Sequence, residues 1–598
     1  MRIFLLWRRF GASEPPFDPQ GVGSDLQKLF SPLFRTPFRT KTMQNSSASL
    51  VLLELPVVGW KPAFYREDDE TWALAPDYPI NARSALAMKG TSVDDDGVLP
   101  ALGRELQAAP AALLQELAPP FSLVWSSKRT GQTFVQTDGL GQSQLFEFQD
   151  GRLWALSNKI LAFRALGVAL EPESEQWAVR ATLGWFPLEM TGYKRIRFLE
   201  PGTQLHLDSN GLTRTRHDVL STWVRSSALS SSDCLELARS SLLRHINAAM
   251  PLCERNSVGL SGGWDSRAVV STLRAAGAEF AARVRGLPGR PDVVIARELA
   301  RIGGFDLKVH SSSGVPPTDV EMCKRSISLA LRWQAGYMVT HKHKTFLADQ
   351  RLLDGGSVNI MGQHGEIGRG YYAKKIRAGE VSEAEYEGWL IGKLMAKMPP
   401  FTRKGFHEIV RYVIRQAFRQ ADRYDLQGSA QLDFFYLYER TRRWASGSLG
   451  SQTGVVLAPF LNPDYIRAVF SYTGDLTINP FHRYIIATHS PDWTAVQYAK
   501  ELDVRHQASE TATASFREPD ILTPDWRPPT GKENYDSLGY WEAVARPIIQ
   551  EALAECGFWT EIFDPDVAER QWPAAPDELA MLYLLPDALQ SRAPGINS

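Results

Sequence analysis

Short apolar stretches alternate with amphipathic stretches between residues 256 and 312. The apolar stretches NSVGL, EFAARVRGL and DLKVHSS have the length of strands, and DSRAVVSTLRAAG and DVVIARELARIGG between them have the spacing of helices. Strands joined by such helices pair in parallel, because the helix carries the chain back to the edge at which the first strand began. The region therefore predicts an α/β unit built on a parallel sheet.

The turn between the first of these strands and its helix reads SGGWDS, residues 261–266. Glycines after a strand let the backbone approach a ligand, and the N-terminus of the next helix offers unpaired N–H groups to an anion. With the hydroxyls of Ser261 and Ser266, the turn predicts a phosphate site. Asp265 would repel phosphate unless Mg²⁺ bridges the two, so it predicts a magnesium ligand. A Gly-rich turn with a capping aspartate explains the same six residues without any ligand.

Whole-chain properties exclude several classes of protein. A chain of 598 residues is too long for one core, so two or more domains are expected. The formal net charge of -1 gives no global attraction to nucleic acid or to an anionic membrane. No apolar run reaches the length of about 18 residues that a membrane-spanning helix requires. Four scattered cysteines fit neither a disulfide framework nor a zinc site, which favours a reducing cytoplasm.

The pattern of strand and helix signals differs between the two halves of the chain. Residues 43–215 contain short strand candidates separated by Gly, Asp and Asn, with helical stretches near 101–117 and 174–184, as in antiparallel α+β domains. Residues 1–42 show no period, so we expect an extension that is poorly ordered, with Met43 as an alternative start. A Ser-rich linker at 216–232 precedes residues 233–598, where we expect the parallel-sheet α/β domain followed by many helices.

Four segments carry a family resemblance: LSGGWDSR (260–267), RGLPGRPDVVIARELA (285–300), MGQHGEIGRGYY (361–372) and LAPFLNPDYIRAVFS (457–471). The first resembles the PP-loop of N-type ATP pyrophosphatases, and together they resemble the asparagine synthetase superfamily. Asn462 departs from the family pattern, which has Asp there. Such enzymes split ATP between its α- and β-phosphates and adenylate a carboxylate.

The resemblance also implies the site residues. ATP and pyrophosphate would contact Leu260, Ser261, Gly262, Gly263, Asp265, Ser266, Arg267 and Gly362. Asp265 and Glu366 would hold Mg²⁺. Both acids follow strands that we expect to be parallel, and the carboxyl ends of such strands are where α/β sheets bind ligands.

The first half of the chain resembles class II glutamine amidotransferase domains, through DGLGQSQLFEFQDGRLWALSNKILAF (138–163) and LGWFPLEMTGYKRIRFLEPGTQLHL (183–207). Members that use glutamine need a cysteine at the mature N-terminus, whose thiolate attacks the amide. Neither Met1-Arg2 nor Met43-Gln44 supplies one. The resemblance therefore implies an amidotransferase-like domain without its nucleophile, and nitrogen from another donor.

Two branches that the chain resembles share this loss, the β-lactam synthetases and the lasso peptide cyclases of the microcin J25 maturation type. Gln363 stands where β-lactam synthetases have a tyrosine that helps to deprotonate the amine. A peptide α-amine, with a pKa of about 7.7–8.0, needs less help. We therefore expect a macrolactam synthetase that joins a peptide's N-terminal amine to an Asp or Glu side chain. A precursor peptide is then the substrate, and a leader peptidase and a small leader-binding protein are the partners.

Other candidate residues keep two interpretations each. His364 is either the base that accepts the amine proton or a histidine satisfied in a polar loop. Arg267 meets phosphate or is a solvated arginine. Arg483, with His482 as the weaker choice, is our candidate for the cation that neutralises the adenylate. Glu439 and Arg440 line an acceptor cleft or form a buried ion pair.

Three alternatives to the cyclase stay open. A small-molecule amide or β-lactam synthetase, or an ammonia-dependent asparagine synthetase-like enzyme, would use the same adenylating chemistry. An inactive binding or regulatory relic would not, although the SGGxDS loop and the second acid favour an active enzyme.

Overall fold

The structure is a computed structural model. It describes residues 2–10, 17–225, 228–286, 290–310, 356–376, 380–445, 454–499 and 557–570, together with Trp333, Ala335 and Tyr337. From the sequence we also expect a polar loop at 506–533 and helices at 540–556 and 577–590. These segments, with Cys323 and Cys556, lie outside the described residues. Cys234 and Cys253 are buried free thiols.

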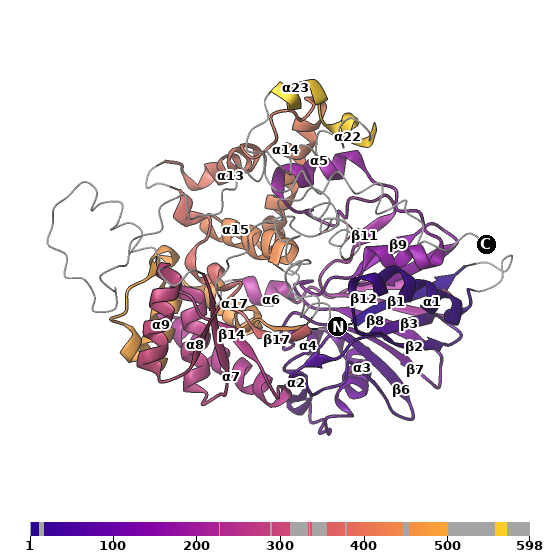
Figure 1. Ribbon diagram of the computed structural model, residues 1–598, viewed down its shortest axis with the longest axis horizontal. Coiled ribbons are helices and arrows are strands. Elements are labelled where there is room, and N and C mark those ends of the chain that lie inside the picture. The colour runs from indigo at the N-terminus through magenta and orange to yellow at the C-terminus, as the bar shows by residue number, and fades with distance from the viewer. Residues whose placement is uncertain are drawn as a thin grey trace.

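Two antiparallel sheets of six strands form the first half of the chain (Figure 1). The first has the order β11-β9-β10-β1-β3-β2 and the second the order β13-β12-β8-β7-β6-β5. The strands of the first sheet are β1 (Arg2–Arg9), β2 (Arg39–Gln44), β3 (Ser49–Glu54), β9 (Phe146–Gln149), β10 (Leu153–Ser157) and β11 (Ile196–Phe198). Those of the second are β5 (Tyr65–Glu67), β6 (Thr71–Asp77), β7 (Ser122–Ser127), β8 (Thr133–Thr137), β12 (Thr203–Asp208) and β13 (Gly211–Arg216).

Strand β1 occupies the middle of the first sheet, with β3 and β10 antiparallel on either side. Ile3, Leu5 and Trp7 pack under helix α1 (Pro19–Phe30), whereas Phe4 and Leu6 pack against the second sheet. The strand is therefore buried on both faces, which explains why its sequence is continuously apolar instead of alternating. The expectation that residues 1–42 lie outside the fold is wrong for the described part of that segment.

Helices cover the outer faces of both sheets and make four layers. Helix α1 and helix α5 (Ser174–Leu183) share the core of the first sheet. Helices α2 (Ala82–Met88), α3 (Val98–Ala108) and α4 (Pro110–Leu114) share that of the second. The predicted helices near 101–117 and 174–184 are confirmed.

A parallel sheet of order β16-β15-β14-β17-β18 forms the centre of the second half. Its strands are β14 (Ser257–Gly259), β15 (Ala281–Arg285), β16 (Leu307–His310), β17 (Gly356–Ile360) and β18 (Val455–Leu457), and its first helices are α7 (Ser231–Ala249), α8 (Trp264–Ala275) and α9 (Pro291–Gly303). Ser230 caps α7 in a capping box with Asp233, as its sequence indicates. The expected fold class, antiparallel sheets followed by a parallel sheet, is confirmed.

The two halves of the chain pack directly on each other and are not joined by a linker alone. Strand β4 (Val57–Val58) pairs with β17, and one apolar core contains residues of both halves. The predicted linker at 216–232 contains helix α6 (Leu220–Val224), in which Trp223 is fully buried. A tryptophan among serines anchors a segment that composition alone marks as a linker.

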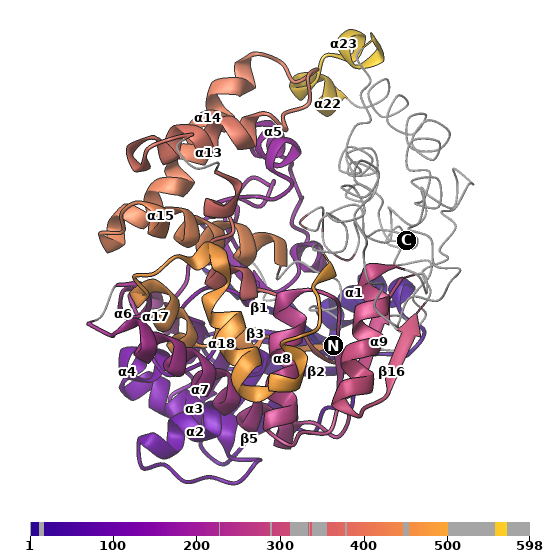
Figure 2. The same cartoon turned by 90° about the vertical axis from the view of Figure 1, so that its left-hand side faces the viewer.

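The remaining helices follow strand β17 in the chain. They are α13 (Tyr386–Met395), α14 (Gly405–Phe418), α15 (Ser429–Phe434), a π-helix (Phe435–Ala445), α17 (Pro463–Ser471), α18 (Pro480–His489), α22 (Gly557–Ile562) and α23 (Pro565–Arg570). Helix α22 packs on α5 and shares the core of the first sheet (Figure 2). Within the described residues, none of the helices combines the length and the apolarity that crossing a membrane requires.

Candidate functional site

The chain changes direction in the parallel sheet at β14. It runs from β14 outward to β15 and β16, and then returns to β17 on the other side of β14. Loops that leave the carboxyl ends of β14 and β17 therefore diverge over the two faces and leave a crevice, the usual ligand site of such sheets. Residues 260–263 and 361–364 form these two loops.

The loop after β14 is held in shape by its own serines. The backbone N–H of Ser261 donates to Ser266 Oγ at 3.0 Å, and the two hydroxyls lie 2.9 Å apart. The N–H of Gly262 donates to the carboxylate of Asp292 at 2.8 Å. Helix α8 starts directly after Gly263, which has no side chain to cap it. Its first N–H groups are thus available to an anion.

The two loops touch at Asp265. A Cβ on Gly362 would lie 2.7 Å from the backbone carbon of Asp265, and one on Gly365 would lie 2.6 Å from Asp265 Oδ1. Only glycine fits at either position without displacing the PP-loop. The glycines of MGQHGE thus bring the loop that carries Glu366 onto the loop that carries Asp265.

Asp265 is half-buried, and each of its carboxylate oxygens lies close to a basic side chain. Its Oδ1 lies 2.8 Å from Nε2 of His482, and its Oδ2 accepts a hydrogen bond of 2.7 Å from Nη1 of Arg369. Burial would raise the pKa of Asp265, but the contacts with His482 and Arg369 outweigh it and lower that pKa. The carboxylate is therefore kept ionised in an enclosed place, as a cation ligand must be.

Glu366 behaves oppositely. Burial, and after it the charge of Asp265, raise the pKa of Glu366 to about 7, and a hydrogen bond from Tyr436 acts against them. Its Oε2 is buried and has no hydrogen-bond partner among the described residues. Two acids that raise each other's cost of ionisation, each with one buried oxygen that makes no hydrogen bond among the described residues, fit a divalent cation between them.

The donor set is small. Within the described residues, no three side chains of the His, Cys, Asp and Glu types converge on one point. A pair of carboxylates suits Mg²⁺, which takes one or two protein carboxylates and completes its shell with water and substrate phosphates. The residues therefore fit magnesium better than a metal that needs a full protein cage.

The other predicted site residues differ from one another in their surroundings. Arg483 is exposed on α18, donates from Nε to the carbonyl of Ile478 at 2.8 Å, and has its guanidinium 4.9 Å from the Trp264 ring centre. It therefore lies beside the loop of residues 261–266. Figure 2 shows α18 next to α8, the helix that begins with Trp264.

Arg267 is fully buried, and its contacts do not favour a phosphate ligand. Its guanidinium donates to the carbonyls of Val496 and Gln497, both at 2.8 Å, and stacks on Tyr498 at 3.8 Å. Arg267 therefore holds a later segment of chain against the PP-loop. This contact corrects both predicted interpretations, because the side chain is neither exposed nor directed at the crevice.

His364 turns away from the two acids. It lies in the left-handed region at φ 77°, is 5% exposed, and lines a cavity whose described lining includes neither Asp265 nor Glu366. Burial lowers its pKa to about 4, so the ring is neutral. The placement favours a positioning role over the predicted base.

Sequence reasoning missed three functional contacts. Arg369 and Tyr436 meet the two acids, and Asp292 meets the PP-loop backbone. His482, rated only a weak candidate for another role, meets Asp265. Asp292 and Arg369 lie within the quoted segments 285–300 and 361–372, but their roles there were not recognised. Tyr436 and His482 come from other elements, and only the tertiary structure brings them to the two acids.

Glu439 is fully buried and accepts from the Leu188 N–H at 3.0 Å, and burial raises its pKa against the charges of Arg443 and Arg442. Arg440 contacts the Tyr372 hydroxyl at 3.4 Å, so the structure does not pair Glu439 with Arg440 among the described contacts.

Comparisons with known proteins give little further guidance. No family model matches the chain, and no curated protein matches it. Among solved structures, a chain titled an allosteric regulatory enzyme of purine biosynthesis aligns with 13% identity and a TM-score of 0.26, over 53% of this chain and 81% of that one. The glutamine phosphoribosylpyrophosphate amidotransferase from B. subtilis, complexed with ADP and GMP, aligns with 13% identity and a TM-score of 0.26, over 52% of this chain and 90% of that one. At these TM-scores the likeness does not by itself establish a shared fold.

Proposed function

We propose that this chain forms an amide bond by way of an acyl-adenylate, and that its substrate is a peptide which it closes into a macrolactam. The observation that supports adenylation is the convergence of Asp265 and Glu366 at the strand-order reversal of the parallel sheet, with Glu366 Oε2 buried and unpaired. A phosphate-binding turn and a pair of enclosed carboxylates are the parts that a magnesium nucleotide requires.

Each group of the site has a task in this scheme. The open N-terminus of α8 and the hydroxyls of Ser261 and Ser266 receive the phosphates, and Arg483 neutralises charge at the rim. Asp265 and Glu366 would hold Mg²⁺, which shields the phosphates and polarises the α-phosphorus. Arg369 and His482 keep Asp265 ionised and oriented.

The chemistry has two steps. A carboxylate oxygen of the substrate attacks the α-phosphorus of ATP, and the bond to the β-phosphate oxygen breaks, so that pyrophosphate leaves. The amine then attacks the acyl carbon, AMP leaves with the bonding electrons, and the amine loses one proton. The peptide loses one water overall, and the enzyme contributes positioning and charge neutralisation.

An aromatic wall beside Glu366 supports a bulky acceptor. Tyr371 stacks on Tyr436 with ring centres 4.2 Å apart. Arg440 lies 4.8 Å from the Tyr371 ring and 5.6 Å from that of Trp185, which belongs to the first half of the chain. Tyr436 and Trp185 are themselves buried, so the half-buried Tyr371 and Arg440 are the groups that a peptide would contact, and such groups bury area at low entropic cost. We further propose that a leader peptidase frees the substrate amine and that a leader-binding protein delivers the peptide.

ATP–pyrophosphate exchange tests the adenylation directly. The protein should exchange label between pyrophosphate and ATP when an acidic peptide is present, and mass spectrometry should find a peptide that has lost one water. Asp265→Asn and Glu366→Gln should each abolish both signals. The control Asp425→Asn changes an exposed acid in a left-handed position that suits asparagine.

Three outcomes would contradict the proposal. Production of ADP instead of AMP excludes adenylation, and normal exchange in Asp265→Asn excludes its role with the metal. Exchange that depends on a small amino acid but on no peptide would favour the small-molecule amide synthetase over the macrolactam synthetase.

A further inference from the structure

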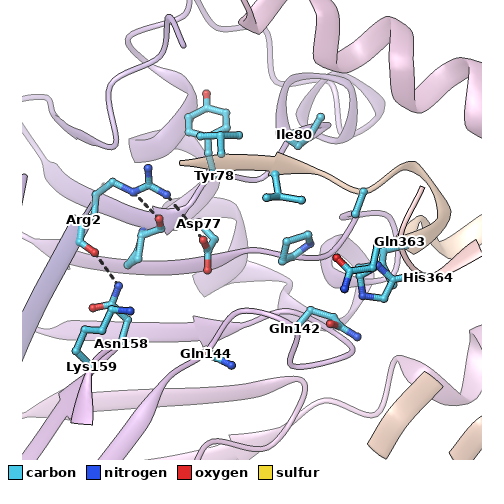
Figure 3. Close-up of a pocket in the computed structure, with 16 residues that line it drawn as sticks. Arg2, Asp77, Tyr78, Ile80, Gln142, Gln144, Asn158, Lys159, Gln363 and His364 are labelled. Carbon is cyan, nitrogen blue, oxygen red and sulfur yellow. Dashed lines mark hydrogen bonds and ion pairs between the residues drawn. The ribbon is translucent and has the colours of Figure 1, made fainter. Parts of the chain in front are cut away.

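A second cavity lies where the two halves of the chain meet. A cavity of about 70 Å³ is lined by residues of the first half, by the loop after β17 and by residues 455–461 (Figure 3). Since one buried water needs about 10–15 Å³, the cavity has room for several waters or one small solute. It is distinct from the crevice at Asp265.

The polar atoms in its wall lack partners. Gln142 is 2% exposed, and neither its amide oxygen nor its amide nitrogen makes a hydrogen bond among the described residues. The same holds for Nη1 of Arg2 and for both ring nitrogens of His364. Each unmade hydrogen bond of a buried group costs about 1–3 kcal/mol, so five such atoms around one cavity indicate a polar occupant.

The charges of the wall indicate which kind of occupant. Arg2 and Lys159 are the basic lining residues and Asp77 is the acidic one. Arg2 is held in place by a bond from its Nε to the Pro76 carbonyl at 2.7 Å, and by Asp77 at 3.8 Å, while its buried Nη1 makes no hydrogen bond among the described residues. Burial lowers the pKa of Lys159 well below its usual value, against the charge of Asp77, so this amine favours its neutral form and the guanidinium of Arg2 is the donor that an anion would meet.

The shape of the cavity adds a second requirement. Figure 3 shows Arg2, Asn158 and Lys159 towards one side, and Gln142, Gln363 and His364 towards the other. An anion at the first side leaves the amide and imidazole at the second side without partners. A ligand with a carboxylate and a second polar group spaced by one or two carbons satisfies both.

We propose that this junction cavity binds a small carboxylic acid with a second polar group, and that the bound acid holds the loop that carries Glu366. Gln363 and His364 belong to that loop, and His364 has a left-handed backbone, which costs on the order of 1–3 kcal/mol unless its surroundings support it. Contacts from a ligand supply such support two residues from the carboxylate. The proposal does not depend on amide-bond formation.

Sodium glycolate is the probe, with sodium chloride at the same ionic strength as the reference. Glycolate should raise the Tm of the full chain saturably beyond the chloride reference, because it binds the folded state alone. It should also slow amide hydrogen exchange in residues 361–370. In Gln142→Leu, which keeps the volume and removes the amide, the affinity for glycolate should fall roughly tenfold, the cost of one good hydrogen bond.

The variant also separates binding from folding. Because the Gln142 amide has no partners among the described residues, Gln142→Leu should fold with an unchanged or higher Tm in chloride. Two results would overturn the proposal: no saturable shift of the parent protein beyond chloride, or an equal shift in Gln142→Leu. Either would mean that the cavity holds only water.

Discussion

At the residue scale, the position of Asp265 depends on two glycines that face it. The backbone of Gly362 packs so closely on residues 265–266 that the smallest side chain would push the two loops apart. Reactions that rely on positioning lose about a hundredfold in rate for a displacement of about 1 Å. Gly362 therefore sets the distance between the two acids although it carries no reacting atom.

Gly362→Ala should reduce ATP–pyrophosphate exchange at least about a hundredfold, for this reason. The matched control is Gly388→Ala in α13, where an added Cβ meets nothing within 4 Å. The control should keep full exchange and gain up to about 1 kcal/mol of unfolding free energy from its better helix propensity. Equal exchange rates in the two variants would contradict the geometric argument.

A second residue-scale prediction concerns pH. Burial raises the pKa of Asp433 from 3.8 to about 8, and its Oδ1 makes no hydrogen bond among the described residues. Between about pH 4 and pH 8 the folded state keeps a proton that the unfolded state has lost, so this group makes the protein less stable as the pH rises. Asp433→Asn removes the titration.

The unfolding free energy of Asp433→Asn should therefore rise relative to the parent between pH 5 and pH 8, by up to about 1.4 kcal/mol per pH unit. Urea denaturation at each pH measures the difference. A difference that stays constant over this range would show that the carboxyl is ionised in the folded protein.

At the scale of elements, the contacts of Asn462 explain why asparagine suits a position where the family resemblance led us to expect aspartate. It caps α17 through Oδ1, which accepts from the Tyr465 N–H at 2.8 Å, while its Nδ2 donates to the Pro459 carbonyl at 2.7 Å. Aspartate would keep the cap and turn the donor into an acceptor that faces a carbonyl. The amide is therefore the better fit for this buried turn.

Asn462→Asp should lower the unfolding free energy by about 1–3 kcal/mol, the cost of leaving a buried acceptor unpaired. Asp475→Asn makes the reverse exchange at an exposed cap, where Asp475 accepts from the Thr477 N–H at 2.7 Å. Because Asp and Asn cap about equally well, the control should change stability by less than about 0.5 kcal/mol. Urea denaturation of both proteins gives the comparison.

The elements that sequence reasoning predicted are those whose signal is local. Helices α8 and α9 and strands β14, β15 and β16 follow from periodicity and length, and the cap of α7 from one serine. Strand β1 was not predicted from the sequence, because its signal is not local. A strand buried on both faces has no alternation, and its neighbours β3 and β10 come later in the chain. Asp265 was singled out by its turn after a strand, and Glu366 by the resemblance of segment 361–372, whereas Tyr436 reaches the site from a π-helix that neither signal marks.

At the scale of the whole molecule, backbone hydrogen bonds join a short segment of the first half of the chain to the second half. The carbonyl of Gly59 accepts from the Glu254 N–H at 2.8 Å, and Lys61 donates its N–H to Leu252 at 3.0 Å. Gly59 has φ +81°, and a Cβ there would lie 2.1 Å from the Arg255 carbonyl oxygen. The pairing of β4 with β17 directly precedes these hydrogen bonds in the chain.

Gly59→Ala should therefore destabilise the whole chain and not one half of it. Gly90→Ala is the control, since Gly90 has φ +80° and nothing within 4 Å of an added Cβ. Both variants should lose about 1–2 kcal/mol of unfolding free energy, because alanine is strained at positive φ. Only Gly59→Ala should lose more, through the steric clash. Calorimetry should show a lower Tm for Gly59→Ala than for Gly90→Ala, and equal values would mean that the halves separate at no cost.

The central place of β1 affects how the chain is made. Its partner β3 ends at Glu54, but its other partner, β10, is complete only at Ser157. During translation, β1 therefore leaves the ribosome with the backbone N–H and C=O groups of one edge unpaired. They stay unpaired for several seconds, while roughly a hundred further residues are added. A chaperone that shields this edge should raise the yield of native protein more than one that acts after release.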